Sequence, residues 1–130
     1  MSQILCLSVR QPWAWLLMEG IKDVENRSWA TDYRGTIALH ASKTETGYEY
    51  RKAQNLIKVR QLQVTLPPLQ QLEVGGLIGT IDIVDCVPHH PSPWYIEGNF
   101  AFVITNPRKG KFVPLKGQLR LFHAVYEGVN

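Results

Sequence analysis

Residues 7–29 read LSVRQPWAWLLMEGIKDVENRSW. The stretch opens on the end of a strand, and Pro12 then suits the first turn of a helix, because its missing N–H is not needed there. Gln11 is the expected N-cap. Apolar residues recur at helical spacing after Pro12, and Gly20 stands where a helix often ends in a left-handed residue. Residues 21–29 are dense in charge, so we expect them to leave the helix and run along the rim of the fold.

The rest of the chain predicts mainly strands. Residues 36–42 alternate as a half-buried strand does, and residues 77–87 are apolar on both faces, which is typical of a central strand. The other predicted elements are a helix over residues 45–63, an irregular loop over 88–99, a turn at 106–110, and strands at 4–9, 100–105, near 112–115 and over 119–127. Five to six strands flanked by two or more helices predict an α+β fold, a small mixed β-barrel.

The composition is that of one globular domain. With 130 residues, of which 45% are apolar and 19% charged, the chain can bury one core but not two, so we expect a single domain over residues 1–130. No apolar run reaches the roughly 20 residues of a transmembrane helix, and no basic region precedes the short apolar start. We therefore expect no membrane partner and a cytoplasmic location.

Cys6 and Cys86 lie in strand-like sequence and are expected to be free thiols; a disulfide would need the two strands to be neighbours.

The opening block resembles the N-terminal signature of the ASCH domain, named for homology to activating signal cointegrator 1. The matched positions are Gln11, Pro12, Trp13, Gly20, Lys22, Glu25, Arg27 and Trp29. Residues 75–87 look like the central strand of that family, and residues 100–122 look like its C-terminal hairpin. The resemblance implies a PUA-like barrel, related to RNA-binding domains, with a cleft beside the first helix that the Lys-Glu-Arg block lines.

The resemblance also implies a set of activities. ASCH proteins are associated with RNA or DNA binding and, in one branch, with hydrolysis of N4-acylated cytidine. That branch has a threonine three residues after the lysine, whereas this sequence has Glu25 there. The sequence therefore departs from the hydrolase branch at this position.

Lys22, Glu25 and Arg27 are the main candidate site residues. Lys22 and Arg27 would donate to a phosphate or a base edge, and arginine is the better suited to bidentate contact. Glu25 would accept from an exocyclic amine or orient the lysine. If the protein is an enzyme, Lys22 and Glu25 are the candidate catalytic residues. The alternative is a solvated cluster of ion pairs, and spacing alone does not settle whether the three side chains converge.

Five further residues are candidate ligand contacts. Trp29 follows the charged block and could offer a face on which a base stacks, or could pack beneath the loop. His40, Ser42 and Lys43 close the second predicted strand beside the expected cleft, although a structural role for the histidine is the common alternative. Asp85 is the aspartate of the central strand that we expect to reach the cleft.

We expect neither a metal nor another cofactor. Asp85, Cys86, His89 and His90 match no zinc-ligand spacing, and the glycines near residue 76 lack the Lys-Ser/Thr of a phosphate loop. The net charge of +3 permits a polyanionic partner. The leading hypothesis is binding of RNA or another nucleic acid. The alternatives are an amidohydrolase acting on a modified cytidine nucleoside, a ribonuclease and a protein-interaction adaptor; the oligomeric state is left open.

Overall fold

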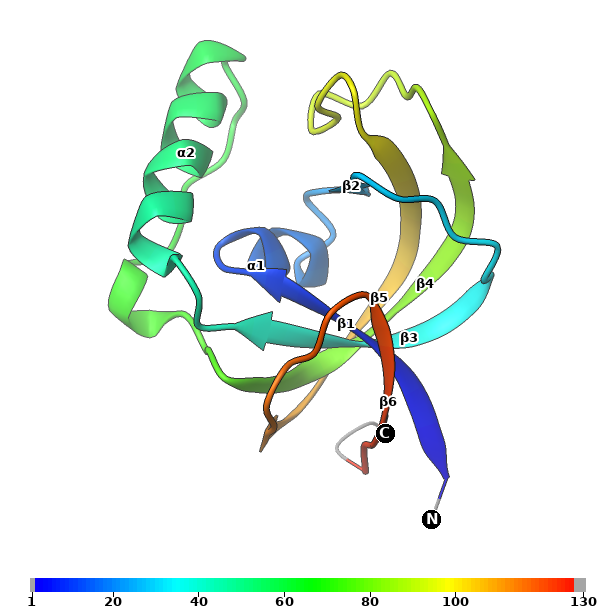
Figure 1. The fold of residues 1–130 in the computed structure, drawn as a ribbon. Coiled ribbons are helices and arrows are strands. Elements are labelled where there is room, and N and C mark those ends of the chain that lie inside the picture. The colour runs from blue at the N-terminus through cyan, green and yellow to red at the C-terminus, as the bar shows by residue number, and fades with distance from the viewer. Residues whose placement is uncertain (1, 128–130) are drawn as a thin grey trace.

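The computed structural model describes residues 2–127, in which one strongly curved sheet of six strands is accompanied by two α-helices (Figure 1). The elements in chain order are β1 (Gln3–Arg10), α1 (Trp13–Met18), β2 (Val24–Arg27), β3 (Gly35–Ser42), α2 (Thr46–Val59), a 3-10 turn (Leu69–Gln71), β4 (Gly76–Val87), β5 (Phe100–Pro114) and β6 (Leu121–Val125). The strand order is β2-β5-β4-β3-β1-β6. Only β1 and β3 are parallel within it.

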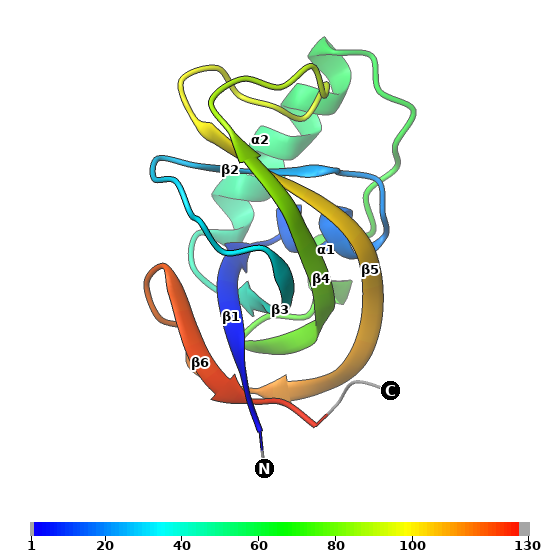
Figure 2. The ribbon, with the colours of Figure 1, turned by 90° about the vertical axis from the view of Figure 1, so that its right-hand side faces the viewer.

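The predicted α+β class is confirmed, and the barrel is open. In the part of the chain that the structure describes, no ladder joins the two edge strands β2 and β6. Figure 2 shows how far the sheet curls: β5 sweeps down one side of the view to the bottom, where its end approaches β6.

Helix α1 forms where the sequence predicts it, one residue later. Pro12 is the N-cap rather than Gln11, but the Gln11 side chain still caps the helix, because its Oε1 accepts a hydrogen bond of 2.8 Å from the backbone N–H of Trp15. Gly20 follows the helix with φ of 73°, the left-handed conformation that glycine adopts without a steric penalty. The buried face of α1 packs on the sheet through Ala14, Leu17 and Met18.

Strand β3 is buried on both faces, so the prediction of a half-buried strand is wrong. Ile37 and Leu39 point into the core that α1 covers, whereas Ala38 belongs to a second cluster with Leu77 and Phe122. The curl of the sheet provides this second cluster, because it brings apolar residues of β4 and β6 over the face of β3 that a flat sheet would leave exposed.

Strand β5 is continuous over Phe100–Pro114, so the predicted turn at residues 106–110 is wrong. The chain bends there without reversing. Asn106 adopts φ of 54°, and the register between β4 and β5 shifts in three places. Such bulges let a strand curve while it stays paired. The signals of a turn, Asn-Pro and Lys-Gly, therefore mark a bend in one long strand.

The charged segment after α1 also forms a strand. Val24–Arg27 pairs antiparallel with β5 as the edge strand β2, in the segment that we expected to run along the rim of the fold. A short edge strand of this kind is paired along one side only. The loop over residues 88–99 contains neither helix nor strand, as predicted.

Helix α2 ends at Val59, four residues before the predicted end at residue 63. Gln61 adopts φ of 54°, which stops the helix, and Leu62 turns back into an apolar cluster that contains Trp94 and Tyr95. Arg60 donates hydrogen bonds to the carbonyls of Pro93 and Tyr95. These contacts hold the C-terminal end of α2 against the 88–99 loop, and the helix stands to one side of the curved strands in Figure 1.

Within residues 2–127 no helix is both long enough and apolar enough to cross a membrane. Cys6 and Cys86 are both free, and Cys6 is fully buried. Burial raises the pKa of the Cys6 thiol to about 11.

Candidate functional site

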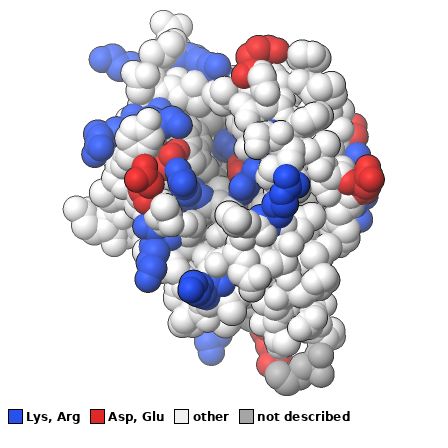
Figure 3. Space-filling view, in the orientation of Figure 1, with Lys and Arg blue, Asp and Glu red and all other residues white. Residues whose placement is uncertain are grey.

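A cavity of about 1340 Å³ lies between α2 and the curved sheet. Its walls come from β1, β2, the end of β3, one face of α2, and the loops before and after β5. Small-molecule sites usually enclose roughly 300–1,000 Å³. The cavity is therefore a groove with room for more than one nucleoside, and Figure 3 shows the hollow it makes in the surface.

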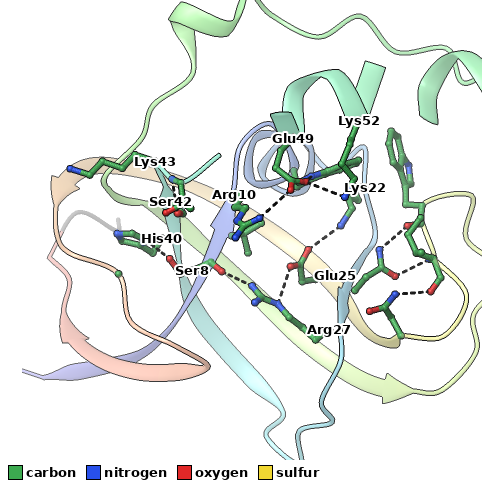
Figure 4. Close-up of a pocket in the computed structure, with 18 of the residues that line it drawn as sticks. Ser8, Arg10, Lys22, Glu25, Arg27, His40, Ser42, Lys43, Glu49 and Lys52 are labelled. Carbon is green, nitrogen blue, oxygen red and sulfur yellow. Dashed lines mark hydrogen bonds and ion pairs between the residues drawn. The ribbon is translucent and has the colours of Figure 1, made fainter. Parts of the chain in front are cut away.

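Lys22, Glu25 and Arg27 meet on one wall of this groove (Figure 4). The Lys22 Nζ donates to Glu25 Oε1 at 3.0 Å and to the Val24 carbonyl at 2.6 Å. The Arg27 Nε lies 3.1 Å from Glu25 Oε2. Lys22 is 3% exposed and Glu25 7%, so the carboxylate is buried between two cations. This arrangement lets each charge compensate its neighbour, which burial requires.

Local structure explains why the three side chains converge. Glu25 and Arg27 are two residues apart in β2 and so project from the same face of the strand. Lys22 reaches that face from the turn after α1, where its backbone N–H bonds to the Leu16 carbonyl at 3.0 Å. Pairing of β2 with β5 fixes the direction of this face.

Arg27 also ties β2 to β1. Its Nη2 donates to the backbone carbonyl of Ser8. Its Nε is buried beside Glu25 but is not aligned for a hydrogen bond with that carboxylate. The Nη1 group takes part in neither contact. The guanidinium is therefore held in a fixed orientation at the groove wall.

His40 is 3% exposed and bonds through both ring nitrogens. The carbonyl of Leu115 lies 2.6 Å from Nε2 and can only accept, so Nε2 bears a proton; the Ser8 hydroxyl lies 2.6 Å from Nδ1. Ser8 and His40 are direct neighbours in the parallel ladder of β1 and β3. Gly117 closes over this pair, because a Cβ at residue 117 would lie 2.6 Å from the Ser8 hydroxyl. The pair therefore ties the loop between β5 and β6 to the sheet.

Glu49 is a second buried carboxylate of the groove, and nothing in the local sequence near the start of α2 indicates its role. Its Oε1 accepts from the Trp13 indole N–H at 2.7 Å, and its Oε2 accepts from Arg10 Nη1 at 3.2 Å. Lys52 Nζ lies 3.7 Å from Oε1. The contacts join α2 to both α1 and β1 across the groove floor (Figure 4).

The groove concentrates the positive charge of the molecule. Eight of the 14 lysines and arginines line it, against two of the 11 carboxylates, so its formal charge is +6 and that of the remaining residues is −3. The cations are Arg10, Lys22, Arg27, Lys43, Lys52, Arg60, Lys116 and Arg120. All of these except Lys22 and Arg27 are exposed. Lysine and arginine side chains surround the hollow in Figure 3.

Not every candidate from the sequence reaches the groove. Ser42 and Lys43 line it, together with the four residues already placed there. Trp29 does not: it packs edge-on against Phe102 at 5.1 Å, and the guanidinium of Arg120 lies 4.8 Å above its ring. Asp85 does not either, because it is exposed at the far end of β4, where it lies 3.5 Å from Arg34. Stacking of a base on Trp29 and a ligand contact by Asp85 therefore have no support from the geometry.

Several residues that line the groove were not predicted as site residues from the sequence. Ser8 and Arg10 belong to β1, and the stretch from Leu115 to Arg120 comes from the C-terminal part of the chain. The sequence feature that could have indicated residues 115–120 is the presence of two cations, Lys116 and Arg120, around Gly117 in a connection between strands. In the part of the chain that the structure describes, no cluster of histidine, cysteine and carboxylate side chains could hold a metal ion.

Comparison with known proteins gives a consistent family assignment. The sequence model of the ASCH domain matches residues 7–114. The chain is 32% identical to activating signal cointegrator 1 of Homo sapiens and 34% identical to the same protein of Mus musculus, each over 134 aligned residues. The alignment covers 90% of this chain and 22% of either relative, so the chain spans about a fifth of the length of these proteins.

Proposed function

The chain belongs to the ASCH domain family, and from this premise we propose that it binds nucleic acid along the groove between α2 and the sheet. The phosphate backbone would lie among the exposed cations, with Lys22 and Arg27 at the inner wall. The relation of the predicted fold to RNA-binding domains makes RNA the first nucleic acid to test.

The charge distribution supports this proposal most strongly. A formal charge of +6 in one groove, against −3 over the rest of the molecule, is the distribution expected of a surface that attracts a polyanion. A protein-interaction surface would be expected to present apolar anchors with fewer charges at its centre. Glu25 and Glu49 do not make the groove acidic, because each of these carboxylates is paired with two cations.

The groove wall formed by Lys22, Glu25 and Arg27 could recognise a phosphate or a base that the exposed cations of the groove do not reach. Arg27 is orientated by Ser8 and Glu25, so a phosphate or a guanine edge would meet a donor that is already placed. Ser42 and Lys43 line another part of the same groove, at the end of β3.

The surroundings of Lys22 give the amidohydrolase hypothesis less support. An amidohydrolase on N4-acetylcytidine would need the Lys22 amine to reach the substrate, but Lys22 is 3% exposed and its amine donates to the Val24 carbonyl and the Glu25 carboxylate. The groove also exceeds the size of a single nucleoside site.

A salt titration of binding tests the proposal. Fluorescence anisotropy with labelled RNA and DNA should give an affinity that falls with salt by a log–log slope of about −0.7 per phosphate contact on a single strand and about −0.9 on a duplex. Lys52→Gln removes one groove cation and should reduce the magnitude of the slope by about one contact.

Lys58→Gln is the matched control, because Lys58 lies on the same helix, is exposed and does not line the groove. It should leave the slope and affinity close to those of the wild type. Equal effects of the two substitutions, or binding that salt does not weaken, would contradict the proposed groove.

A further inference from the structure

Leu119 is the most exposed large apolar residue in the described chain. Its side chain is 92% exposed, in the loop between β5 and β6, and it lies at the edge of the groove. An isolated surface leucine is ordinary, but this one stands between groove cations, with Lys116 and Arg120 on either side of it in the sequence.

The loop that presents Leu119 is held at both ends. At its start, the Leu115 N–H bonds to the Gly75 carbonyl at 3.1 Å and the Leu115 carbonyl accepts from His40 Nε2 at 2.6 Å. At its end, the Arg120 guanidinium rests on the ring of Trp29.

The middle of the loop is also in close contact with the sheet. Gly117 approaches Ser8 and His40 so closely that any Cβ there would lie 2.6 Å from the Ser8 hydroxyl and 2.8 Å from His40 Cε1. A loop tied in this way presents Leu119 in one place, so little conformational entropy is lost when a ligand meets it.

The groove lacks the aromatic platforms on which unpaired bases usually stack. Its two aromatic rings other than His40 are Trp13 and Trp94. Trp94 is 4% exposed, and Lys22 Nζ lies over the Trp13 ring at 5.6 Å from its centroid. Single-strand binders use exposed rings for this purpose. Proteins that open a duplex instead insert an apolar side chain between stacked bases while nearby cations hold the phosphates.

We propose that Leu119 is a wedge that enters the base stack of a double-stranded nucleic acid and opens one base step at the groove. This inference rests on the proposed function, because the cations of the groove must first bind the backbone. Lys116 and Arg120 would contact the phosphates on either side of the opened step, and Leu119 would replace the stacking contact that the bases lose.

The experiment uses a short duplex with 2-aminopurine, whose fluorescence rises when it leaves the base stack. Wild-type protein should raise the emission at least about twofold as it binds. Leu119→Ala should still bind, with an unchanged salt slope and melting temperature, but should lose most of the emission rise. Its affinity should change by less than about tenfold, because burial of the leucine and the cost of unstacking offset each other.

Two further variants make the result specific. Leu119→Met restores a long apolar side chain and should restore the emission rise. Val84→Ala is the matched control, because Val84 is another exposed apolar residue, at 50%, which lies on β4 outside the groove. It should behave as the wild type does.

The outcomes separate this inference from the function on which it rests. Duplex binding without an emission rise, an undiminished rise in Leu119→Ala, or a clear preference for single strands would overturn the wedge and leave nucleic-acid binding in place. Failure to bind any RNA or DNA would overturn both.

Discussion

At the scale of single residues, Arg27 is a structural tie as well as the proposed ligand contact, because its guanidinium joins the Ser8 carbonyl to Glu25. Arg27→Lys keeps the charge and loses the fork of donors. We expect the affinity for nucleic acid to fall by roughly 1–3 kcal/mol, measured by anisotropy at fixed salt. We expect the free energy of unfolding, measured by urea titration, to fall by about 1 kcal/mol, because a lysine can satisfy only part of the same hydrogen bonding.

Arg34→Lys is the control for this substitution. Arg34 pairs with Asp85 on the surface, with both side chains well exposed, so the exchange should change neither quantity by more than about 0.5 kcal/mol. Unchanged nucleic-acid binding in Arg27→Lys would remove Arg27 from the site, and loss of the folded state would make its role purely structural.

At the scale of elements, the position of α2 depends on Glu49, which joins the helix to α1 and β1 through Trp13 and Arg10. Glu49→Gln removes the charge that holds these donors. We expect the free energy of unfolding to fall by about 1–3 kcal/mol, and hydrogen exchange of α2 amides to speed up more than that of β3 and β4. The reason is that only Glu49 and Ala53 of α2 are buried, so the helix has few packing contacts and can open separately.

Glu45→Gln serves as the comparison, because Glu45 precedes the same helix and is exposed. It should leave exchange in α2 unchanged. A uniform acceleration across the whole sheet in Glu49→Gln would show that α2 does not open on its own.

At the scale of the whole molecule, Asp82 connects three strands and makes stability depend on pH. It lies in β4, accepts from Thr36 Oγ1 of β3 at 2.6 Å and from Asn106 of β5 at 3.1 Å, and pairs with Arg108 of β5. The Thr36 hydrogen bond and these neighbours together lower the pKa of the Asp82 carboxyl below its usual 3.8.

A folded-state pKa below the unfolded value stabilises the protein above the unfolded pKa, and the contribution is lost as the pH falls through the folded pKa. Asp82→Asn should therefore be less stable than the wild type at pH 7 by about 1 kcal/mol. The difference should shrink in urea titrations below about pH 4. A stability difference for Asp82→Asn that stays constant with pH would refute the linkage.

The elements that depend on local causes could be predicted from the sequence. Helix α1 begins after Pro12, whose ring restricts φ, and ends before Gly20, which adopts the left-handed conformation without a steric penalty. The first half of β4 was recognisable as a central strand because burial on both faces over residues 77–81 leaves a continuous apolar run, although Val84 and Asp85 farther along are exposed. The Lys22, Glu25 and Arg27 block stood out for its charge density and its resemblance to the ASCH signature, without any knowledge of its geometry.

The way in which these parts form a groove depends on tertiary contacts. Ser8 meets His40 because parallel pairing of β1 and β3 brings distant residues into register. Lys22 and Arg27 meet Glu25 because β2 pairs with β5, and Asn106 bends β5 where local signals indicate a turn. Pairing and curvature depend on contacts between segments far apart in the chain, and no local pattern encodes them. The same long-range packing gathered eight cations from separate segments around one groove.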